Sequence, residues 1–161
     1  MDELTQYLKL KEYNELKLEQ ILNKKIIITK DHINNINAIS CCIFMINIIK
    51  LFEKYGYVFT NDDYIMLVSK CGIILEYIFE DKKTDEICKI AVQQNGYALK
   101  FVPDDKKTDE MCKIAVSENG YALNFVPEDK KTHEICEIAV ETDFNALNFV
   151  PSNKKRFIHK K

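Results

Sequence analysis

The chain has 161 residues, of which 47% are hydrophobic and 30% charged, with only three prolines and four glycines. This balance is typical of a folded protein and excludes a disordered chain, and the length excludes a large multidomain enzyme. A formal net charge of -2 gives no overall electrostatic reason to bind nucleic acid or an anionic membrane. Arg156 is the only arginine, so the planar group that binds phosphate bidentately is nearly absent, which disfavours phosphoryl-transfer chemistry.

Residues 1–59 contain no internal repeat, and we expect them to form a helical cap on the segment that follows. The N-terminus lacks the basic-then-apolar order of a secretory signal, so we expect an intracellular protein, cytoplasmic or nuclear, that is not secreted. The most apolar stretch, Ala38 to Ile49, is 12 residues long. A membrane-spanning helix needs about 18 to 20 apolar residues, so this stretch is predicted to be a buried core helix with no membrane role.

The rest of the chain is a tandem repeat with a period of 24 residues. Three copies match position by position, and a degenerate copy precedes them. A unit this short cannot bury its apolar face alone, so successive copies must stack. The predicted array covers residues 60–155, with copies at 60–83 (degenerate), 84–107, 108–131 and 132–155, and a basic tail at 156–161.

Within each copy the pattern predicts a longer helix, a tight turn and a short helix. Thr84 stands where an N-cap is expected, and the acidic residues after it suit the positive end of a helix dipole. Apolar residues then recur at three- and four-residue spacing. Asn95 and Gly96 are predicted to end the helix, with the glycine in the left-handed conformation. Pro103 ends the second apolar group, and the acidic and lysine residues after it are expected to form a solvated connector.

These features predict an all-α fold, a short α-solenoid of two-helix repeats with a helical N-terminal cap. The rival is a leucine-rich-repeat-like α/β solenoid, because a 24-residue period is normal for that class and its L-x-x-L-x-L-x-x-N-x-L pattern fits each copy. A strand over Ile90 to Val92, however, would turn the alanine between them outward and expose a cysteine in every copy. The helical interpretation is therefore favoured, and the leucine-rich-repeat-like fold stays as the alternative.

The consensus Thr-x-Glu-x-Cys-x-x-Ala-Val-x-x-Asn-Gly-x-Ala-Leu-x-Phe-Val-Pro resembles a short helical repeat of unknown function that is abundant in mimivirus-like giant viruses of amoebae and also occurs in some amoeba-associated bacteria. The resemblance covers residues 84–151 and, more weakly, 60–83. The last copy departs from it, with Asp143, Phe144 and Asn145 where the two copies before it have Asn-Gly-Tyr. The resemblance implies a helical repeat and brings no established catalytic residues.

The chemistry-bearing residues favour a structural interpretation. The six cysteines are expected to be reduced and buried, because equivalent positions on stacked helices lie too far apart for a disulfide and offer one thiol per layer to a metal. Glycine-rich phosphate loops, nucleophile elbows and zinc-protease motifs are missing from the sequence. We therefore expect no enzymatic activity, no cofactor and no metal site. The cysteines repeated in the array are Cys88, Cys112 and Cys136, and Cys41 and Cys42 lie side by side in the apolar stretch.

Positions that vary between copies mark the candidate surface. Stacking would align them in rows, which is how solenoids form extended binding faces, although a solvated face also varies by drift. The two tyrosines could be half-exposed anchors of such a face or could seal the gap between layers. The predicted partner-binding face comprises Lys89, Gln93, Lys100, Lys113, Ser117, Asn124, Glu137, Glu141, Tyr97 and Tyr121.

Three functional hypotheses follow from this architecture. The first is a non-catalytic module that binds an unknown protein partner, acting in an infected host cell if the viral resemblance holds. The second is a structural, self-associating component of a virion or other assembly. The third is a nucleic-acid accessory protein that uses the basic tail, which could equally be a polar end to the array. The array itself is net acidic, so it gives no reason to expect nucleic-acid binding.

Overall fold

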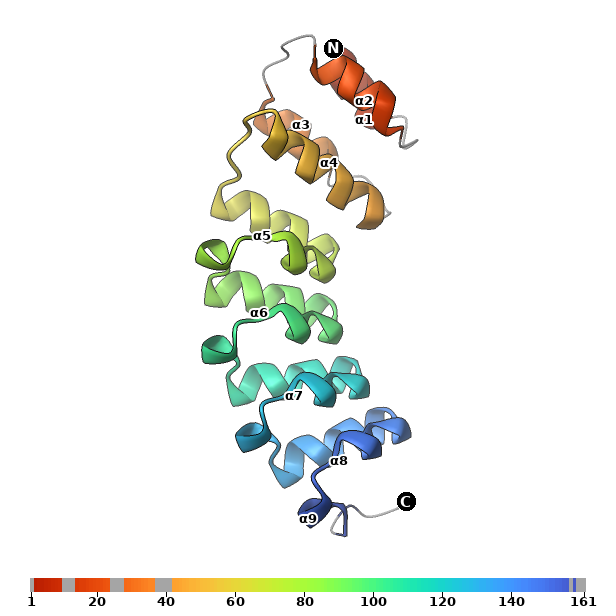
Figure 1. Cartoon of the computed structure of the whole chain (residues 1–161), viewed down its shortest axis with the longest axis vertical. Coiled ribbons are helices and arrows are strands. Elements are labelled where there is room, and N and C mark those ends of the chain that lie inside the picture. Colours follow the sequence, from red (N-terminus) through yellow and green to blue (C-terminus); the bar gives the residue numbers. More distant parts are fainter. Residues whose placement is uncertain (1, 10–13, 24–27, 37–41, 157, 159–161) are drawn as a thin grey trace. The chain divides into compact units, whose positions relative to one another are not determined.

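The structure, a computed structural model, describes residues 2–9, 14–23, 28–36, 42–156 and 158. Every regular element in this part of the chain is a helix, so the all-α prediction is confirmed and the leucine-rich-repeat alternative is wrong (Figure 1). The segment that the alternative made a strand lies inside a capped helix, α6. The α-helices are α1 (Glu3–Lys9), α2 (Glu15–Leu22), α3 (Lys30–Ile36), α4 (Cys42–Lys54), α5 (Asn61–Lys70), α6 (Asp85–Gln94), α7 (Asp109–Glu118), α8 (His133–Thr142) and α9 (Ser152–Lys155).

The chain forms two compact units, residues 1–67 and 68–161, and the division falls within α5. In the first unit α1 packs against α2 and α3. Its core contains Leu4, Leu18 and Ile33, each fully buried. The predicted limit between cap and array, after residue 59, was defined by the sequence repeat and not by contacts, so it stays a prediction.

Helix α4 carries most of the apolar stretch identified in the sequence. One face of it is buried, with Met45, Ile48, Ile49 and Phe52 all at most 2% exposed. The core-helix prediction is therefore confirmed from residue 42 onward, and its first part, residues 38–41, lies outside the described residues. Within the described chain, the helices are all too short or too polar to span a bilayer.

Helix α5 begins with a capping box that the sequence analysis missed. The Thr60 backbone N–H donates to Asp63 Oδ2 at 2.9 Å, and the Asp63 N–H donates back to Thr60 Oγ1 at 3.3 Å. Burial alone would raise the pKa of Asp63, but hydrogen bonds from Lys30 and Thr60 hold it below its usual value. Burial and the nearby Asp63 carboxylate raise the pKa of Tyr57 to about 12. Asp63 is therefore an ionised buried anchor between α3 and the start of α5.

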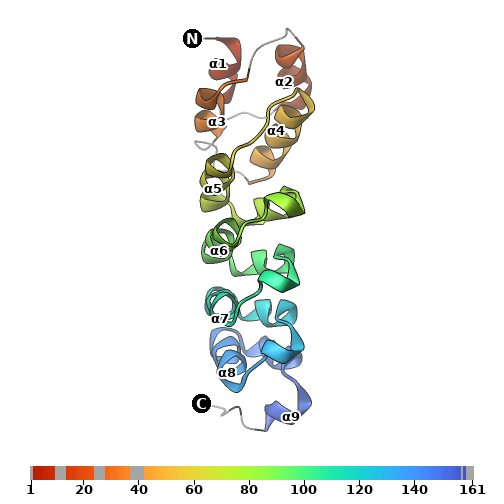
Figure 2. The same ribbon diagram turned by 90° about the vertical axis from the view of Figure 1, so that its left-hand side faces the viewer.

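The second unit repeats one supersecondary element. Each complete copy consists of a ten-residue α-helix, a six-residue 3₁₀-helix and a short C-terminal turn of helix. Figure 2 shows α6, α7 and α8 stacked in one layer and the 3₁₀-helices stacked in a second. The predicted short helix is thus of the 3₁₀ type. These elements are η1 (Gly72–Tyr77), η2 (Glu80–Lys82), η3 (Gly96–Phe101), η4 (Asp104–Lys106), η5 (Gly120–Phe125), η6 (Glu128–Lys130) and η7 (Phe144–Phe149).

The predicted helix start and the role of proline are both confirmed. The Thr84 hydroxyl accepts from the Ile87 N–H at 3.2 Å, and the threonines of the next two copies cap α7 and α8 in the same way. At the end of η3, Val102 has ψ 131°, outside the helical range, directly before Pro103.

The predicted role of the glycine was wrong. Among the described glycines only Gly56 has a positive φ, so Gly96 does not end α6 through the left-handed conformation. The extended residue Asn95 ends it, and its side chain accepts from the Tyr97 N–H at 3.0 Å. Glycine is required for another reason: a Cβ on Gly96 would lie 2.2 Å from the carbonyl oxygen of Ala115 in the next copy. In the last copy Asp143 makes the same turn as Asn95.

Candidate functional site

Six of the ten residues of the predicted face lie on the α-helix layer, where its lysines join consecutive repeats. Lys89 Nζ of α6 lies 2.9 Å from Glu110 Oε1 of α7, and Lys113 Nζ of α7 lies 2.7 Å from Glu134 Oε2 of α8. Glu137 occupies the same position in α8. Lys89 and Lys113 therefore link consecutive repeats. The remaining predicted residues of this layer, Gln93, Ser117 and Glu141, are exposed.

The remaining four residues lie on the 3₁₀ layer, where the two tyrosines form part of a continuous row of rings. The Tyr97 ring meets the Phe125 ring edge-on at 5.1 Å between centroids, and Tyr121 meets Phe149 in the same way at 4.9 Å. Within each copy, Tyr97 contacts Phe101 at 6.1 Å and Tyr121 contacts Phe125 at 5.8 Å. We call these five residues the aromatic strip. It runs without interruption across three copies.

The strip combines packing with exposure. Tyr121 is 41% exposed, and the other four rings are partly exposed. Lys100 Nζ lies 5.6 Å from the Tyr97 ring centroid and 5.3 Å from that of Phe101, within cation–π range. Asn124 is exposed at the position that Lys100 has in the copy before. The tyrosines therefore seal the contact between repeats and reach solvent together, which joins the two roles that the sequence left open.

The structure thus divides the predicted face between two layers. Lys89, Gln93, Lys113, Ser117, Glu137 and Glu141 belong to α-helices, whereas Tyr97, Lys100, Tyr121 and Asn124 belong to 3₁₀-helices. Partner binding by either set stays a prediction.

The connector after each proline contains a buried lysine that sequence reasoning missed. Lys83, Lys107 and Lys131 are at most 8% exposed. The Lys107 ammonium donates to the Phe125 carbonyl oxygen of the next copy at 3.1 Å and to Asp104 at 2.8 Å. The expectation of a solvated connector is therefore wrong for the second lysine, whereas the acidic residues of the connector are exposed. The long lysine stem buries its methylenes and places its charge against a backbone carbonyl of the next copy.

The first lysine of the same pair points to the preceding copy. Lys106 Nζ donates to the Lys83 carbonyl oxygen at 2.6 Å, and Lys154 makes the same contact with Lys131. The Lys106–Lys107 pair therefore links its copy to both neighbours. The only signal in the sequence was that the pair stands unchanged in every copy.

The three repeated cysteines are buried and unpaired. Cys88, Cys112 and Cys136 are fully buried, which confirms the packing interpretation. Burial raises the pKa of Cys88 and Cys112 to about 11 and raises that of Cys136. Cys71 is disulfide-bonded, so the expectation of six reduced cysteines is wrong for that residue. Cys41 and the Cys42 side chain lie outside the described residues.

These thiols should resist alkylation in the folded protein. At pH 8 a thiol with a pKa of about 11 is almost wholly protonated, and only the thiolate reacts. We expect iodoacetamide at pH 8 to leave Cys88, Cys112 and Cys136 unmodified for hours and to modify all three in denaturant within minutes, as measured by mass spectrometry of peptides. Rapid labelling of Cys112 under native conditions would contradict the packed array.

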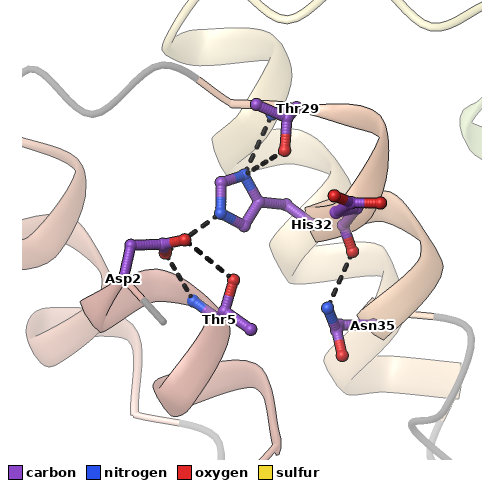
Figure 3. A network of polar contacts seen from close by, with 6 residues as sticks. Asp2, Thr5, Thr29, His32 and Asn35 are labelled. Carbon is purple, nitrogen blue, oxygen red and sulfur yellow. Dashed lines mark hydrogen bonds and ion pairs between the residues drawn. The ribbon is translucent and has the colours of Figure 1, made fainter.

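A polar network in the first unit has the composition of a hydrolase triad (Figure 3). His32 Nε2 lies 3.1 Å from Asp2 Oδ1, and Thr29 Oγ1 lies 3.2 Å from His32 Nδ1. However, the Thr29 backbone N–H also donates to Nδ1, at 2.9 Å, so this nitrogen already has a donor. His32 is only 3% exposed and lies three residues after Thr29, in the arrangement of a helix cap. Asp2 in turn accepts from the Thr5 N–H at 2.8 Å, which lowers its pKa. The hydrogen bonds of Asp2, Thr29 and His32 are therefore those that cap the ends of helices.

Of the basic tail, the structure describes Arg156 and Ile158. Arg156 is exposed, whereas Lys154 is partly buried through its contact with Lys131. His159, Lys160 and Lys161 lie outside the described residues. In the described part of the chain there is no cluster of three or more His, Cys, Asp or Glu side chains suited to a metal ion.

A family model called Domain of unknown function (DUF4116) matches the chain twice, over residues 64–105 and 108–153. Together the two matches cover more than half of the sequence. The chain belongs to the DUF4116 family. No curated protein and no solved structure is significantly similar to it.

The two matches correspond to pairs of repeats. Each DUF4116 match spans most of two 24-residue copies, the first containing η1 and α6 and the second containing α7 and α8. The aromatic strip crosses from the first match into the second, because Tyr97 lies in one and Phe125 in the other. The strip is therefore a property of the DUF4116 array and not of one domain copy.

Proposed function

We propose that this DUF4116 protein is a non-catalytic scaffold that binds a protein partner through the aromatic strip. The observation that carries the proposal is the continuous, partly exposed row of five rings across three repeats. Aromatic rings with one buried edge and one exposed edge are the residues that contribute most to protein interfaces.

The strip is organised in advance of binding. Tyr121 and Phe125 each touch a ring of their own copy and a ring of a neighbouring copy, so little rotamer freedom remains to be lost when a partner covers them. Lys100 and Asn124 border the strip with exposed hydrogen-bond donors. A polar border around an apolar centre is the usual arrangement of a protein-binding surface.

The α-helix layer is a weaker candidate. Lys89 and Lys113 are already engaged by glutamates of the next helix. A partner would have to replace these pairs with ion pairs of its own. The new exposed ion pairs would contribute little binding energy.

The location and origin belong to the same proposal. The unpaired Cys88, Cys112 and Cys136 are compatible with an intracellular site, whereas the disulfide at Cys71 is typical of an oxidising compartment. A role in an infected host cell is supported by the viral resemblance of the repeat and by its 22 lysines to a single arginine, as an AT-rich genome yields.

The test is affinity purification and mass spectrometry from cells that naturally contain the protein. The strip variant carries Lys100→Ala, Tyr121→Ala and Asn124→Ala. The matched control carries Gln93→Ala, Ser117→Ala and Glu141→Ala on the α-helix layer. All six side chains are exposed, but Tyr121 also packs between repeats, so circular dichroism and urea unfolding of both variants are measured first to show that they fold.

We expect one discrete partner that the wild type and the control retain and that the strip variant loses. Retention by the strip variant, or loss by the control alone, would place the interaction elsewhere. Recovery of the protein without any partner would remove the interaction function.

A further inference from the structure

The face at the C-terminal end of the described repeat stack is built like the contact between repeats, and no repeat among the described residues covers it. In the copies followed by another repeat, the valines Val92 and Val116 are fully buried, whereas the equivalent Val140 of α8 is partly exposed. Likewise Leu99 and Leu123 are fully buried, and Leu147 is partly exposed. Figure 1 shows α8 as the last long helix of the stack.

Phe144 is the substitution that distinguishes the last copy from the copies before it. It occupies the position of Gly72, Gly96 and Gly120, where a Cβ would lie 2.2 to 2.4 Å from a carbonyl oxygen of the next copy. Phe144 is 62% exposed. A phenylalanine there prevents any further repeat from stacking in the way the others do. The occupant of this face is therefore not another array added head to tail.

Two charged positions border the same face. Glu137 replaces the lysine that in α6 and α7 pairs with the next helix, and Lys155 occupies the position of the lysines that donate to the next copy. Neither forms an ion pair with a described residue of its own chain. Within the described residues, this face thus has an acid, Glu137, and a base, Lys155, that are not ion-paired, beside an apolar centre. We call Glu137, Val140, Phe144, Leu147 and Lys155 the end face.

We propose that the end face joins two copies of the chain in a two-fold, tail-to-tail dimer. In a two-fold contact, a residue i that meets residue j of the other copy is matched by j meeting i, so a face with one acid and one base is complementary to itself. Glu137 of one copy then faces Lys155 of the other, and Phe144 packs between the two. The end face has the residue positions that elsewhere in the array pack against another repeat of this chain, which favours a second copy of the chain as its partner.

The dimer is tested by sedimentation velocity on the full chain, from about 1 to 200 µM, a range that spans the micromolar affinity of a small interface. We expect the mass to rise with concentration toward twice that of the monomer. Phe144→Ser should weaken the dimer by about 10-fold or more, as for a central interface aromatic. Phe79→Ser is the matched control, because Phe79 is similarly exposed, at 64%, but lies at the proline position of the first copy.

Charge exchange gives a second, independent readout. Glu137→Lys and Lys155→Glu should each weaken the dimer, and the double variant should restore it, because the pair is re-formed with reversed sign. A wild type that remains monomeric throughout the range would overturn the proposal. So would a dimer that survives Phe144→Ser or that the double variant fails to restore.

Discussion

Gly96→Ala should destabilise the repeat array by about 3 kcal/mol, the upper part of the usual range for overpacking. The added Cβ would lie 2.2 Å from the Ala115 carbonyl oxygen and 3.2 Å from the Asn119 Cβ. Both neighbours are held by the backbone of α7 and its C-terminal end, so they cannot move without opening the contact between two copies. The measurement is urea denaturation followed by circular dichroism at 222 nm.

The matched control is Phe144→Gly, which changes the same repeat position in the last copy. No following repeat approaches this position, so its stability should change by less than about 1 kcal/mol, mainly through the added backbone freedom. Equal stability of Gly96→Ala and wild type would show that the repeats are not packed as closely as described.

Lys107→Met should cost about 2 kcal/mol, because it removes the ammonium group that donates to the Phe125 carbonyl oxygen. Methionine keeps most of the stem volume, so the loss reports the missing hydrogen bond and not a cavity. The ion pair with Asp104 adds little, since the Asp104 side chain is 86% exposed. The same denaturation measurement gives the difference in free energy of unfolding.

Lys155→Met is the control for this second prediction. It alters the equivalent lysine after the last repeat, where the side chain is exposed, and its effect should stay within about 0.5 kcal/mol at low protein concentration. A Lys107→Met variant as stable as wild type would mean that the buried lysines are not links between copies.

The helical fold could be predicted because its signals are local. A threonine N-cap, apolar residues at helical spacing and a proline after the second apolar group each act within one copy, and the period showed that the copies stack. The burial of Cys88 follows from the same pattern. The 3₁₀ form of the second helix was not predicted, since six residues carry too little periodicity to separate it from an α-helix.

The contacts between copies could not be predicted from the sequence, for a different reason. The glycine signal is the same for a left-handed turn and for close backbone approach, and only the position of Ala115 decides between them. A charged lysine is normally solvated, so nothing local indicated that Lys107 would be buried against a carbonyl 18 residues away. The candidate face was predicted as one surface, and its distribution over two layers was not predicted, because variability between copies does not tell which layer a residue occupies.

The most direct test of the aromatic strip as a binding surface is photo-crosslinking in the native cells. A benzophenone amino acid replaces Tyr121 on the 3₁₀ layer in one variant and Ser117 on the α-helix layer in the other, both exposed. We predict that the Tyr121 variant forms a crosslink to one partner protein and the Ser117 variant forms none. A crosslink from Ser117 alone, or a partner that co-purifies with both variants and crosslinks to neither, would contradict the account.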